Sequence, residues 1–458
     1  MRDKKLPVPG LEECIAASGG TQALLAGDGV YGEIPRLLRK EYAAERVFLI
    51  GDENTMQAAG NGVERLLMTA GIPVAGKLVF QEKGWLHADY AHTALVKDRI
   101  SAAGPPVVPL SVGSGTINDL VKLAAGELGL PYICVPTAAS VDGFTSFGAA
   151  ILKDGFKQTM PCAAPRCVVA DTTVLAQAPA WLSSSGFADL AGKITAGADW
   201  IIAESVEPFG AKGAEAREPQ SWAMVQNGLY GYLEQSIGAA EGSGNALKAL
   251  FEALSITGFA MQYSKSSRPV SGAEHLFAHI WEMENLSHNG LPVTHGHKVA
   301  IGTLVSTAFL EILFSGADGP PPPPPSFKRP SLEECLAETA AAFANSPALD
   351  SAVKTSAEKY HDAAAAAEIT SGIHDTWKEL REKTLEQIMP YAGLRSMLAR
   401  ARCPVLPAQI NLSREAVIAC ARRARMIRNR YICLDLAWDL GCFDTVLARM
   451  EESEVYLR

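Results

Sequence analysis

The chain has 458 residues, of which 48% are hydrophobic, and it carries a formal net charge of -9. This length and apolar content predict two or three globular domains with substantial cores. The acidic balance excludes a protein that binds nucleic acid nonspecifically, because such binding needs a basic surface.

The N-terminal sequence MRDKKLPVPGLEE has no apolar segment of the kind that follows the charged start of a signal peptide. No window approaches the length of a membrane-spanning helix, so we expect a cytoplasmic protein without an integral membrane segment. The nine cysteines are odd in number and scattered, which favours free thiols in a reducing compartment.

The first part of the chain is expected to alternate strands and helices. Short apolar runs, each bounded by turn formers or followed by a helical pattern, lie at 46–50, 77–80, 107–112, 132–135 and 167–170. Strands of this kind, separated by helices, predict a buried parallel sheet. The helical spacing of apolar residues after Gly115 is the strongest example.

Two strand ends carry features of nucleotide-binding sites. Asp52 follows the first strand and could accept hydrogen bonds from a ribose, although a helix N-cap role for Asp52 or Asn54 is the simpler alternative. The sequence Gly113-Ser114-Gly115 lies between a strand and a helix, where glycine lets the backbone approach a pyrophosphate. It matches neither GxGxxG nor a Walker loop, and two glycines at such a turn can be purely steric.

The loop at 136–146 follows the next strand and consists of small and polar residues, PTAASVDGFTS. Ligands of open parallel sheets bind beyond the carboxyl ends of the strands, which is where this loop lies. The alternative is an ordinary turn.

From Ala178 onward the pattern changes to long amphipathic helices. We therefore expect a Rossmann-like domain at 1–177 and an all-helical domain at 178–458. The first helix contains Asp189 and Lys193 one turn apart, which a surface ion pair would explain. The small residues around them would also allow the close helix approach that a buried polar site needs.

Histidines concentrate in two helix-like segments between Ser264 and Leu304. Five of the nine lie there: His275, His279, His288, His295 and His297. Histidine is the commonest metal ligand, so the cluster suggests a metal site. A pair of packed histidines on one helix face is the alternative, and a metal would need a further ligand from elsewhere.

The C-terminal part contains two compositional features. A Pro-rich loop at about 316–330 cannot form a regular helix or sheet and is expected to be an exposed spacer. The arginine-rich stretch at 422–430 could form a basic patch, but its interleaved aliphatic residues favour a salt-bridged packing helix.

Several motifs together resemble the sn-glycerol-1-phosphate dehydrogenase family, within the superfamily of iron-containing alcohol dehydrogenases, glycerol dehydrogenase and dehydroquinate synthase. The motifs, in chain order, are GSGTINDL, VPTAASVDGFTS, FADLAGK, SRPVSGAEHLFAH, THGHKVAIGT and MIRNRYICLDLAWDLG. The resemblance covers most of the chain. It implies a Rossmann-like domain followed by a helical domain, the dehydroquinate synthase-like fold.

The resemblance also implies a divalent cation, zinc, nickel or iron, held by one carboxylate and two histidines. Motif for motif, these ligands correspond to Asp189, His275 and His295, which supplies the ligand that spacing alone left missing. The match departs at His297, where relatives more often carry Glu or Gln.

The nicotinamide cofactor is expected to be NAD(H), with NADP(H) as the alternative, because an acidic Asp52 at the adenosine ribose disfavours a 2'-phosphate. The resemblance assigns residues to three parts of the cofactor and substrate site. The pyrophosphate residues are Gly113, Ser114, Gly115 and Asp119; the nicotinamide residues are Thr137, Ser140 and Ser146; and Asp142 lies near the substrate hydroxyls. Asp142 and Lys193 are the predicted catalytic residues.

The implied reaction is the reversible reduction of dihydroxyacetone phosphate to sn-glycerol 1-phosphate, by an enzyme expected to be a homo-oligomer. Ether-lipid synthesis, and so phospholipid metabolism, is the family association. A phosphorylated substrate needs local positive charge, for which Arg268 is the first candidate and Lys193 and Lys265 are weaker ones. A glycerol dehydrogenase-like polyol oxidoreductase and a dehydroquinate synthase-like lyase are the alternatives.

Overall fold

The computed structural model describes residues 7–42, 46–81, 84–104, 106–153 and 156–458. The chain forms two compact units, Met1–Leu190 with Gln220–Ser267, and Ala191–Pro219 with Arg268–Arg458. The domain boundary expected at residue 177 stays a prediction. The first six residues of the N-terminus, where we expected no signal peptide, lie outside the described residues.

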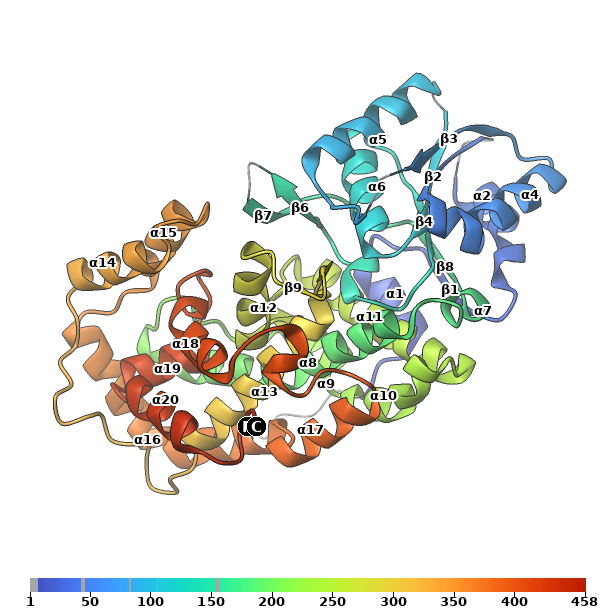
Figure 1. The fold of residues 1–458 in the computed structure, drawn as a ribbon. Helices are drawn as coiled ribbons and strands as arrows, with labels where there is room; N and C mark the ends of the chain where they lie inside the picture. Colours follow the sequence, from blue (N-terminus) through green and yellow to red (C-terminus); the bar gives the residue numbers. More distant parts are fainter. Residues whose placement is uncertain (1–6, 43–45, 82–83, 105, 154–155) are drawn as a thin grey trace. The chain divides into compact units, whose positions relative to one another are not determined.

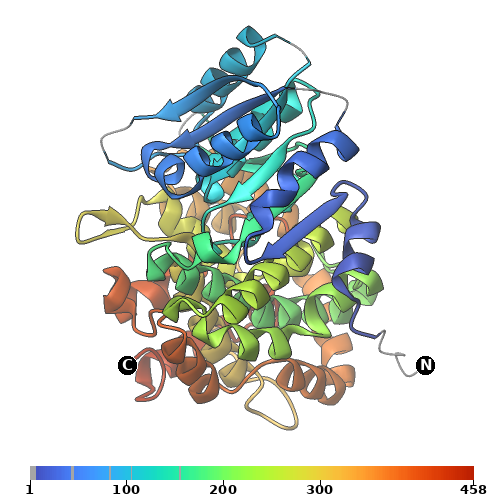
Figure 2. The same ribbon diagram turned by 90° about the vertical axis from the view of Figure 1, so that its right-hand side faces the viewer.

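The first unit contains a six-stranded sheet in the order β1-β8-β5-β4-β2-β3 (Figures 1 and 2). All neighbouring strands are parallel. Its strands are β1 Ala23–Gly27, β2 Val47–Asp52, β3 Val74–Phe80, β4 Val108–Gly113, β5 Ile133–Pro136 and β8 Cys167–Asp171. An antiparallel pair, β6 Ala149–Lys153 and β7 Phe156–Met160, forms a separate ribbon.

Central strands of this sheet are buried along their length because both faces are covered. Every residue of β4 and β8 is buried, and Leu49, Leu110 and Val135 belong to one hydrophobic cluster. Continuous apolar runs of this kind are typical of parallel sheets, and fully burying one such side chain contributes about 1.5–3 kcal/mol. This is the sheet that the sequence predicted.

The strand order brings predicted cofactor residues together at the carboxyl-terminal ends of two neighbouring strands. From β2 the chain proceeds to its neighbour β3 at one side of the sheet, and it then returns to β4 on the other side of β2 and continues to β5. The reversal between β2 and β4 is the topological switch point, where open parallel sheets bind ligands beyond their carboxyl ends. Asp52 ends β2 and Gly113 ends β4.

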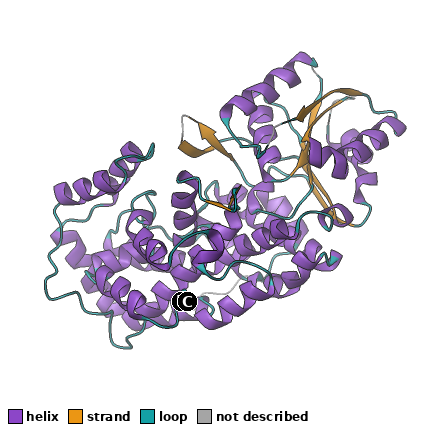
Figure 3. Ribbon diagram, in the orientation of Figure 1, coloured by secondary structure: helices purple, strands orange, loops and turns teal. Residues whose placement is uncertain are grey.

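After Asp171 the chain is almost wholly helical, apart from the short pair β9 Ser287–His288 and β10 Leu291–Pro292 (Figure 3). The helices up to residue 264 are α1 Leu11–Ser18, α2 Ile34–Glu41, α3 Glu53–Thr55, α4 Asn61–Thr69, α5 Tyr90–Ala102, α6 Gly115–Glu127, α7 Thr172–Leu175, α8 Ala180–Val206, α9 Pro219–Gln226, α10 Leu229–Ser236 and α11 Gly244–Ser264. The later ones are α12 Ala273–Met283, α13 His295–Leu313, α14 Leu332–Ala342, α15 Leu349–Lys359, α16 Ala363–Gln387, α17 Tyr391–Arg400, α18 Arg414–Ala424, α19 Cys433–Asp439 and α20 Phe443–Glu452.

Helices α12 and α13 lie against each other in the second unit, at very short range. A Cβ atom added to Gly302 of α13 would lie 2.3 Å from the Glu274 carbonyl oxygen of α12, so only glycine allows this approach. The buried Asp199 of α8 accepts hydrogen bonds from the N–H groups of Ala273 (2.6 Å) and Cys433 (2.7 Å). One carboxylate therefore caps the N-termini of both α12 and α19.

Helix α13 corrects one expectation from the sequence. By length and composition it could cross a membrane, although no such window was expected. In the structure 89% of its most apolar window is buried inside the protein, as in the core helix of a globular protein. No helix or strand lies between Leu313 and Leu332, which agrees with the predicted Pro-rich loop.

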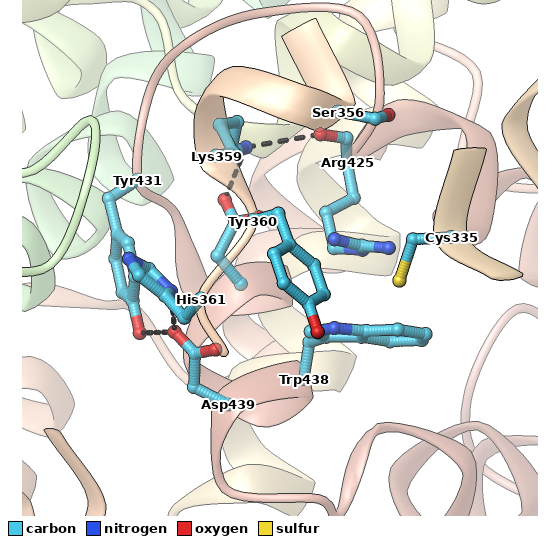
Figure 4. A pocket seen from close by; sticks show the side chains of 10 residues that line it. Cys335, Ser356, Lys359, Tyr360, His361, Arg425, Tyr431, Trp438 and Asp439 are labelled. Carbon is cyan, nitrogen blue, oxygen red and sulfur yellow. Dashed lines mark hydrogen bonds and ion pairs between the residues drawn. The ribbon is translucent and has the colours of Figure 1, made fainter. Parts of the chain in front are cut away.

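A buried set of polar side chains, the C-terminal polar network, joins α15 to α19 in the second unit (Figure 4). Lys359 Nζ lies 2.7 Å from Asp435 Oδ2, while Asp439 Oδ2 accepts from His361 Nδ1 (3.0 Å) and Tyr431 Oη (2.9 Å). The cavity at its centre, about 10 Å³, has room for roughly one water molecule. The network is therefore a structural feature, in which buried charges are paired.

Candidate active site

The glycine turn at the end of β4 is shaped by close contacts. A Cβ atom on Gly113 would lie 2.6 Å from Ile117 Cβ, and one on Gly115 would lie 3.0 Å from Val141 Cγ2. The Gly113 carbonyl accepts a hydrogen bond from the Thr137 N–H (3.1 Å), which joins the turn to the following loop. Helix α6 begins at this turn, with Ser114 as N-cap, so its first N–H groups can face an anion.

Asp52 and Asp119, the two predicted acidic cofactor residues, both have structural contacts. Asp52 Oδ1 accepts from the Thr55 N–H (2.8 Å) and caps α3, the alternative that the sequence left open. Asp119 Oδ2 accepts from the Ala150 N–H at 3.4 Å, and its other oxygen lies 3.7 Å from Lys122 Nζ. Their contacts with a cofactor remain predictions.

Lys122 holds the loop that was predicted to line the nicotinamide. Its side chain is fully buried, and Nζ donates to the carbonyl oxygens of Gly143 (2.6 Å), Ser146 (3.1 Å) and Gly148 (3.1 Å) and to Ser146 Oγ (3.2 Å). A buried ammonium that meets several carbonyl oxygens is satisfied by them. These hydrogen bonds therefore fix the conformation of the loop at 137–146, in which Thr137, Ser140 and Ser146 are buried.

Helix α8 contacts the same loop within the first unit. A Cβ atom on Gly186 would lie 2.0 Å from the Ala139 carbonyl oxygen, so the approach requires glycine. Ser185 Oγ donates to the Ser140 carbonyl (3.2 Å), and Asp189 Oδ2 accepts from the Asp142 N–H (2.9 Å). These contacts link the predicted cofactor loop directly to the predicted metal ligand Asp189.

The three predicted metal ligands converge. Ligand atoms of Asp189, His275 and His295 all lie within 4.8 Å of one another. The division between the units falls inside α8, after Leu190, so Asp189 belongs to the first unit and the later part of the same helix to the second. Three residues further along that helix, a Cβ atom on Gly192 would lie 3.5 Å from His275 Cε1.

In each of the two histidines, the ring nitrogen Nδ1 lies within hydrogen-bond distance of a carboxylate. His275 Nδ1 lies 2.7 Å from Glu274 Oε1, and His295 Nδ1 lies 2.8 Å from Glu282 Oε1. A carboxylate at Nδ1 places the proton there and makes Nε2 the basic nitrogen, as in carboxylate–histidine–metal sites. With the Asp189 carboxylate, this donor set fits a divalent cation such as zinc, nickel or iron.

The carboxylates are themselves fixed by hydrogen bonds. Glu274 accepts from the Gly272 N–H (2.6 Å) and from Thr195 Oγ1 (2.8 Å). Burial alone would raise the pKa of Glu274, but its contacts with His275 and these donors hold the pKa below its usual value. Glu274 is therefore a charged partner for the His275 ring.

His279 and His297 lie beside this centre. The His279 ring is 6.4 Å from that of His275 and 6.1 Å from that of His295, and its Nδ1 is 3.2 Å from Glu282 Oε2. Burial lowers the pKa of both His279 and His297 to about 4. Both rings are therefore neutral near pH 7.

The predicted cationic residues differ in their surroundings. Lys193 is fully buried on α8, one turn after Asp189, whereas Lys265 follows the end of α11. Arg268 is only 2% exposed and donates to the carbonyl oxygens of Asp199 (3.0 Å) and Tyr431 (3.0 Å). This arrangement indicates a structural role, and phosphate binding by Arg268 or Lys193 stays a prediction.

Sequence reasoning did not find Lys122, Glu274 and Glu282. Lys122 appears in the sequence as one polar residue of an amphipathic helix, and its loop partners lie at least 21 residues away. Glu282 is 13 residues from His295. The acidic residue immediately before His275 was the one available signal, since ligating histidines commonly bond a carboxylate.

Comparison with known proteins places these features in a family context. A family model described as iron-containing alcohol dehydrogenase matches residues 25–179. A Bacillus velezensis protein named glycerol-1-phosphate dehydrogenase (NAD(P)+) is 36% identical over 284 residues, which are 62% of this chain and 70% of that protein. A Geobacillus stearothermophilus protein of the same name is 28% identical over 425 residues, 90% of this chain and 91% of its own length.

Solved structures share the fold at low sequence identity. A Schizosaccharomyces pombe glycerol dehydrogenase aligns with a TM-score of 0.53 and 16% identity, covering 96% of this chain and 94% of its own. An archaeal halo-thermophilic Red Sea brine pool alcohol dehydrogenase aligns with a TM-score of 0.58 and 13% identity, covering 93% and 98%. The predicted combination of a Rossmann-like sheet and a helical region is confirmed by these neighbours.

Proposed function

Because the chain belongs to the glycerol-1-phosphate dehydrogenase family, we propose that it reduces dihydroxyacetone phosphate to sn-glycerol 1-phosphate with NADH or NADPH. The observation that carries the proposal is the convergence of one carboxylate and two histidines within 4.8 Å, beside a loop tied to the end of β4. Such a donor set would hold a divalent cation that polarises a ketone for hydride transfer from the nicotinamide.

The proposed ligands are Asp189, His275 and His295. When bound there, a divalent cation would act as a Lewis acid that polarises the ketone. Glu274 and Glu282 hold the two imidazole rings and keep their protons on Nδ1. These carboxylates thereby preserve the basic nitrogens that a cation requires.

The proposed cofactor site lies at the carboxyl edge of the sheet. The Gly113–Gly115 turn and the start of α6 would bind the pyrophosphate, and the nicotinamide would supply the hydride. Lys122 fixes the loop that carries Thr137, Ser140 and Ser146 through its bonds to carbonyl oxygens. A fixed loop holds the reactive ring at a constant distance from the substrate, which favours transfer.

Asp52 and Asp142 are assigned to specificity. An acidic Asp52 near the adenosine ribose would disfavour a 2'-phosphate, so NADH is the proposed preferred cofactor. Asp142 would contact the substrate hydroxyls; its backbone N–H donates to Asp189 Oδ2, so the residue adjoins a proposed metal ligand. Lys193, one turn from Asp189 and buried, is the proposed partner for charge that develops at the reacting oxygen.

The experiment is a rate measurement of NADH oxidation with dihydroxyacetone phosphate or dihydroxyacetone. The protein is first stripped with a chelator and then supplied with zinc, nickel or iron. We expect metal-dependent turnover that is at least about 100-fold faster with the phosphate ester, because one charge-assisted contact with a phosphate is worth roughly 3 kcal/mol. Which metal restores the highest rate identifies the preferred ion.

Two outcomes would redirect the proposal. Equal or faster turnover of dihydroxyacetone would indicate a glycerol dehydrogenase-like polyol oxidoreductase. No net change in NADH with either ketone would lead to a lyase of the dehydroquinate synthase type, in which the cofactor is oxidised and reduced again within one turnover. The chirality of the product, measured by chiral chromatography, distinguishes sn-glycerol 1-phosphate from its enantiomer.

Three further assignments rest on family membership. We place the enzyme in the cytoplasm, in phospholipid metabolism, and as a homo-oligomer of two or more chains. Light scattering of the purified protein measures the last directly, and a monomer at micromolar concentration would contradict it.

A further inference from the structure

The loop at 137–146 carries the residues that the proposed function assigns to the nicotinamide, and Lys122 is only one of the groups that hold it. Thr145 precedes Ser146 in this loop and is fully buried. Resting on the proposed function, we infer that Thr145 is a positioning residue, which binds the loop to helix α11 and so holds the nicotinamide at the distance that hydride transfer requires.

Helix α11 binds Thr145 at two points. Thr145 Oγ1 donates to the Ser255 carbonyl oxygen (2.8 Å), and the Thr145 carbonyl oxygen accepts from Gln262 Nε2 (2.6 Å). Ser255 and Gln262 are two turns apart on the helix. The Thr145 hydroxyl is therefore committed to α11, so the residue acts on the nicotinamide through its neighbour Ser146.

A glycine in the helix makes room for this residue. Between Ser255 and Gln262, α11 carries Gly258, where an added Cβ atom would lie 2.0 Å from Thr145 Oγ1. The same atom would lie 3.0 Å from the Ser146 nitrogen. Any side chain at this position would push the loop away, so the contact depends on the absence of one.

The amide that holds the loop is itself fixed. Gln262 is buried, and its Nε2 also donates to Thr21 Oγ1 (3.0 Å), whose hydroxyl donates to the Pro165 carbonyl oxygen (2.9 Å). Within the loop, the Phe144 ring packs on Phe251 of α11, with 5.6 Å between the ring centroids. A buried polar network and an aromatic contact therefore keep α11 and the loop in one arrangement.

The contacts of α11 complement those of Lys122 on α6. Lys122 Nζ binds the carbonyl oxygens of Gly143 and Ser146, on either side of the segment that α11 holds. The Gly113–Gly115 turn, which is assigned to the pyrophosphate, has close contacts of its own. Loss of the Thr145 contact should therefore release the nicotinamide end of the site and leave the adenosine diphosphate end unchanged.

A small change in the loop is expected to have a clear kinetic effect, because hydride transfer depends on the distance and angle between the nicotinamide and the ketone. A misplacement of about 1 Å can lower a rate about 100-fold. A single buried hydrogen bond corresponds to about a 10-fold change in an equilibrium. Thr145 should therefore affect kcat more strongly than the binding of the whole cofactor.

The kinetic test compares Thr145→Val and Thr145→Ser with the wild type. Valine keeps the shape of threonine and lacks the hydroxyl, whereas serine keeps the hydroxyl. With the preferred ketone, we expect Thr145→Val to lower kcat about 10-fold and Thr145→Ser to stay within about 3-fold of the wild type. NADH deuterated at the transferred position should give a larger isotope effect on kcat in Thr145→Val, because hydride transfer then limits the rate.

Binding measurements separate the two ends of the cofactor. ADP-ribose lacks the nicotinamide, so its dissociation constant, measured by calorimetry, should stay within about 2-fold of the wild type in Thr145→Val. The dissociation constant of NADH, measured by its fluorescence, should rise about 5-fold. A disturbance of the whole domain would instead weaken the binding of both ligands alike.

Thr257→Val is the matched control, because the buried Thr257 of α11 donates its hydroxyl to another carbonyl oxygen of that helix, that of Leu254, also at 2.8 Å. It should lose stability but keep kcat and both affinities. An equal kcat in Thr145→Val and Thr257→Val, or equal losses in Thr145→Val and Thr145→Ser, would overturn the inference while the proposed function stands. A wild type that turns over neither ketone would overturn the proposed function, and the ratio of the NADH and ADP-ribose affinities would then decide on Thr145 alone.

Discussion

Two buried polar regions of this protein use similar residues in different ways. In the C-terminal polar network, opposite charges meet directly, as in Lys359 with Asp435, and the cavity has room for roughly one water molecule. In the cluster of Asp189, His275 and His295, three groups that can bind a metal converge, and a carboxylate lies within hydrogen-bond distance of Nδ1 in each histidine ring. Paired charges complete a fold, whereas convergent ligand atoms with fixed tautomers prepare a binding site.

The largest effect is expected from Asp189→Asn, which removes a ligand charge from the cluster. The amide keeps an oxygen that can accept the Asp142 N–H, so the loop contact survives. We expect kcat/KM to fall by about 1000-fold or more and bound metal to be lost, because a neutral amide is a weak ligand. Metal analysis and steady-state kinetics measure both.

If Asp189→Asn kept its metal and lost only activity, the carboxylate would act on the substrate and not on the ion. The corresponding change in the C-terminal polar network, Asp435→Asn, should leave metal content unchanged. This contrast separates a binding site from a structural network.

Lys359→Met tests the structural side of the comparison. It leaves the Asp435 carboxylate buried without its cation, a change that typically costs about 3–5 kcal/mol of stability. Chemical denaturation should therefore show a large shift in the unfolding midpoint. The double variant Lys359→Met/Asp435→Leu should recover part of this loss, since an apolar pair leaves no buried charge; no recovery would mean that the carbonyl bonds of Lys359 dominate.

Glu282→Gln should affect the metal site more moderately. Glutamine can still accept a hydrogen bond from His295 Nδ1, but it no longer carries the charge that makes the imidazole a stronger ligand. We expect metal affinity to fall by about 10–100-fold, measured by competition with a chromophoric chelator. Thermal stability of the metal-free protein should change little, and a large change there would point to a structural role.

The smallest effect concerns the pH dependence of stability. Burial and the nearby Glu274 raise the pKa of Asp199 from its ordinary value of 3.8 to about 6. Between pH 3.8 and about 6 the Asp199 carboxyl is protonated in the folded protein but ionised in the unfolded chain. The stability that this proton contributes is therefore lost as the pH rises through about 6. Asp199→Asn cannot titrate, so its deficit in melting temperature relative to the wild type should narrow between about pH 4.5 and 7. A constant deficit would show that Asp199 stays ionised throughout.

Much of the sheet could be predicted because its signals are local, whereas the ligand set of the metal cluster came from the family resemblance, since spacing alone left the third ligand open. The run at 107–112 followed by Gly113-Ser114-Gly115 anticipated β4 and the start of α6 closely, since buried strands and tight turns depend on neighbouring residues. The short edge strand β1 and the β6–β7 ribbon were missed. The long-range partners of Lys122 and Lys359 also depend on tertiary contacts that no spacing encodes.

The arginine-rich segment illustrates both outcomes. The prediction of a salt-bridged helix is confirmed for Arg422 and Arg423. Arg430 instead donates to the Ser271 carbonyl and Arg425 lies over the Trp438 ring, contacts that depend on tertiary neighbours and could not be read from the sequence.

The most direct test of the central claim is equilibrium binding of zinc to the metal-free protein. It compares the wild type with His295→Ala and with His288→Ala, a histidine of the same region outside the converging group. The account predicts one tightly bound ion per chain in the wild type and in His288→Ala, and at least about a 1000-fold weaker affinity in His295→Ala. An unchanged, stoichiometric ion in His295→Ala would contradict the assignment of this cluster as the metal site.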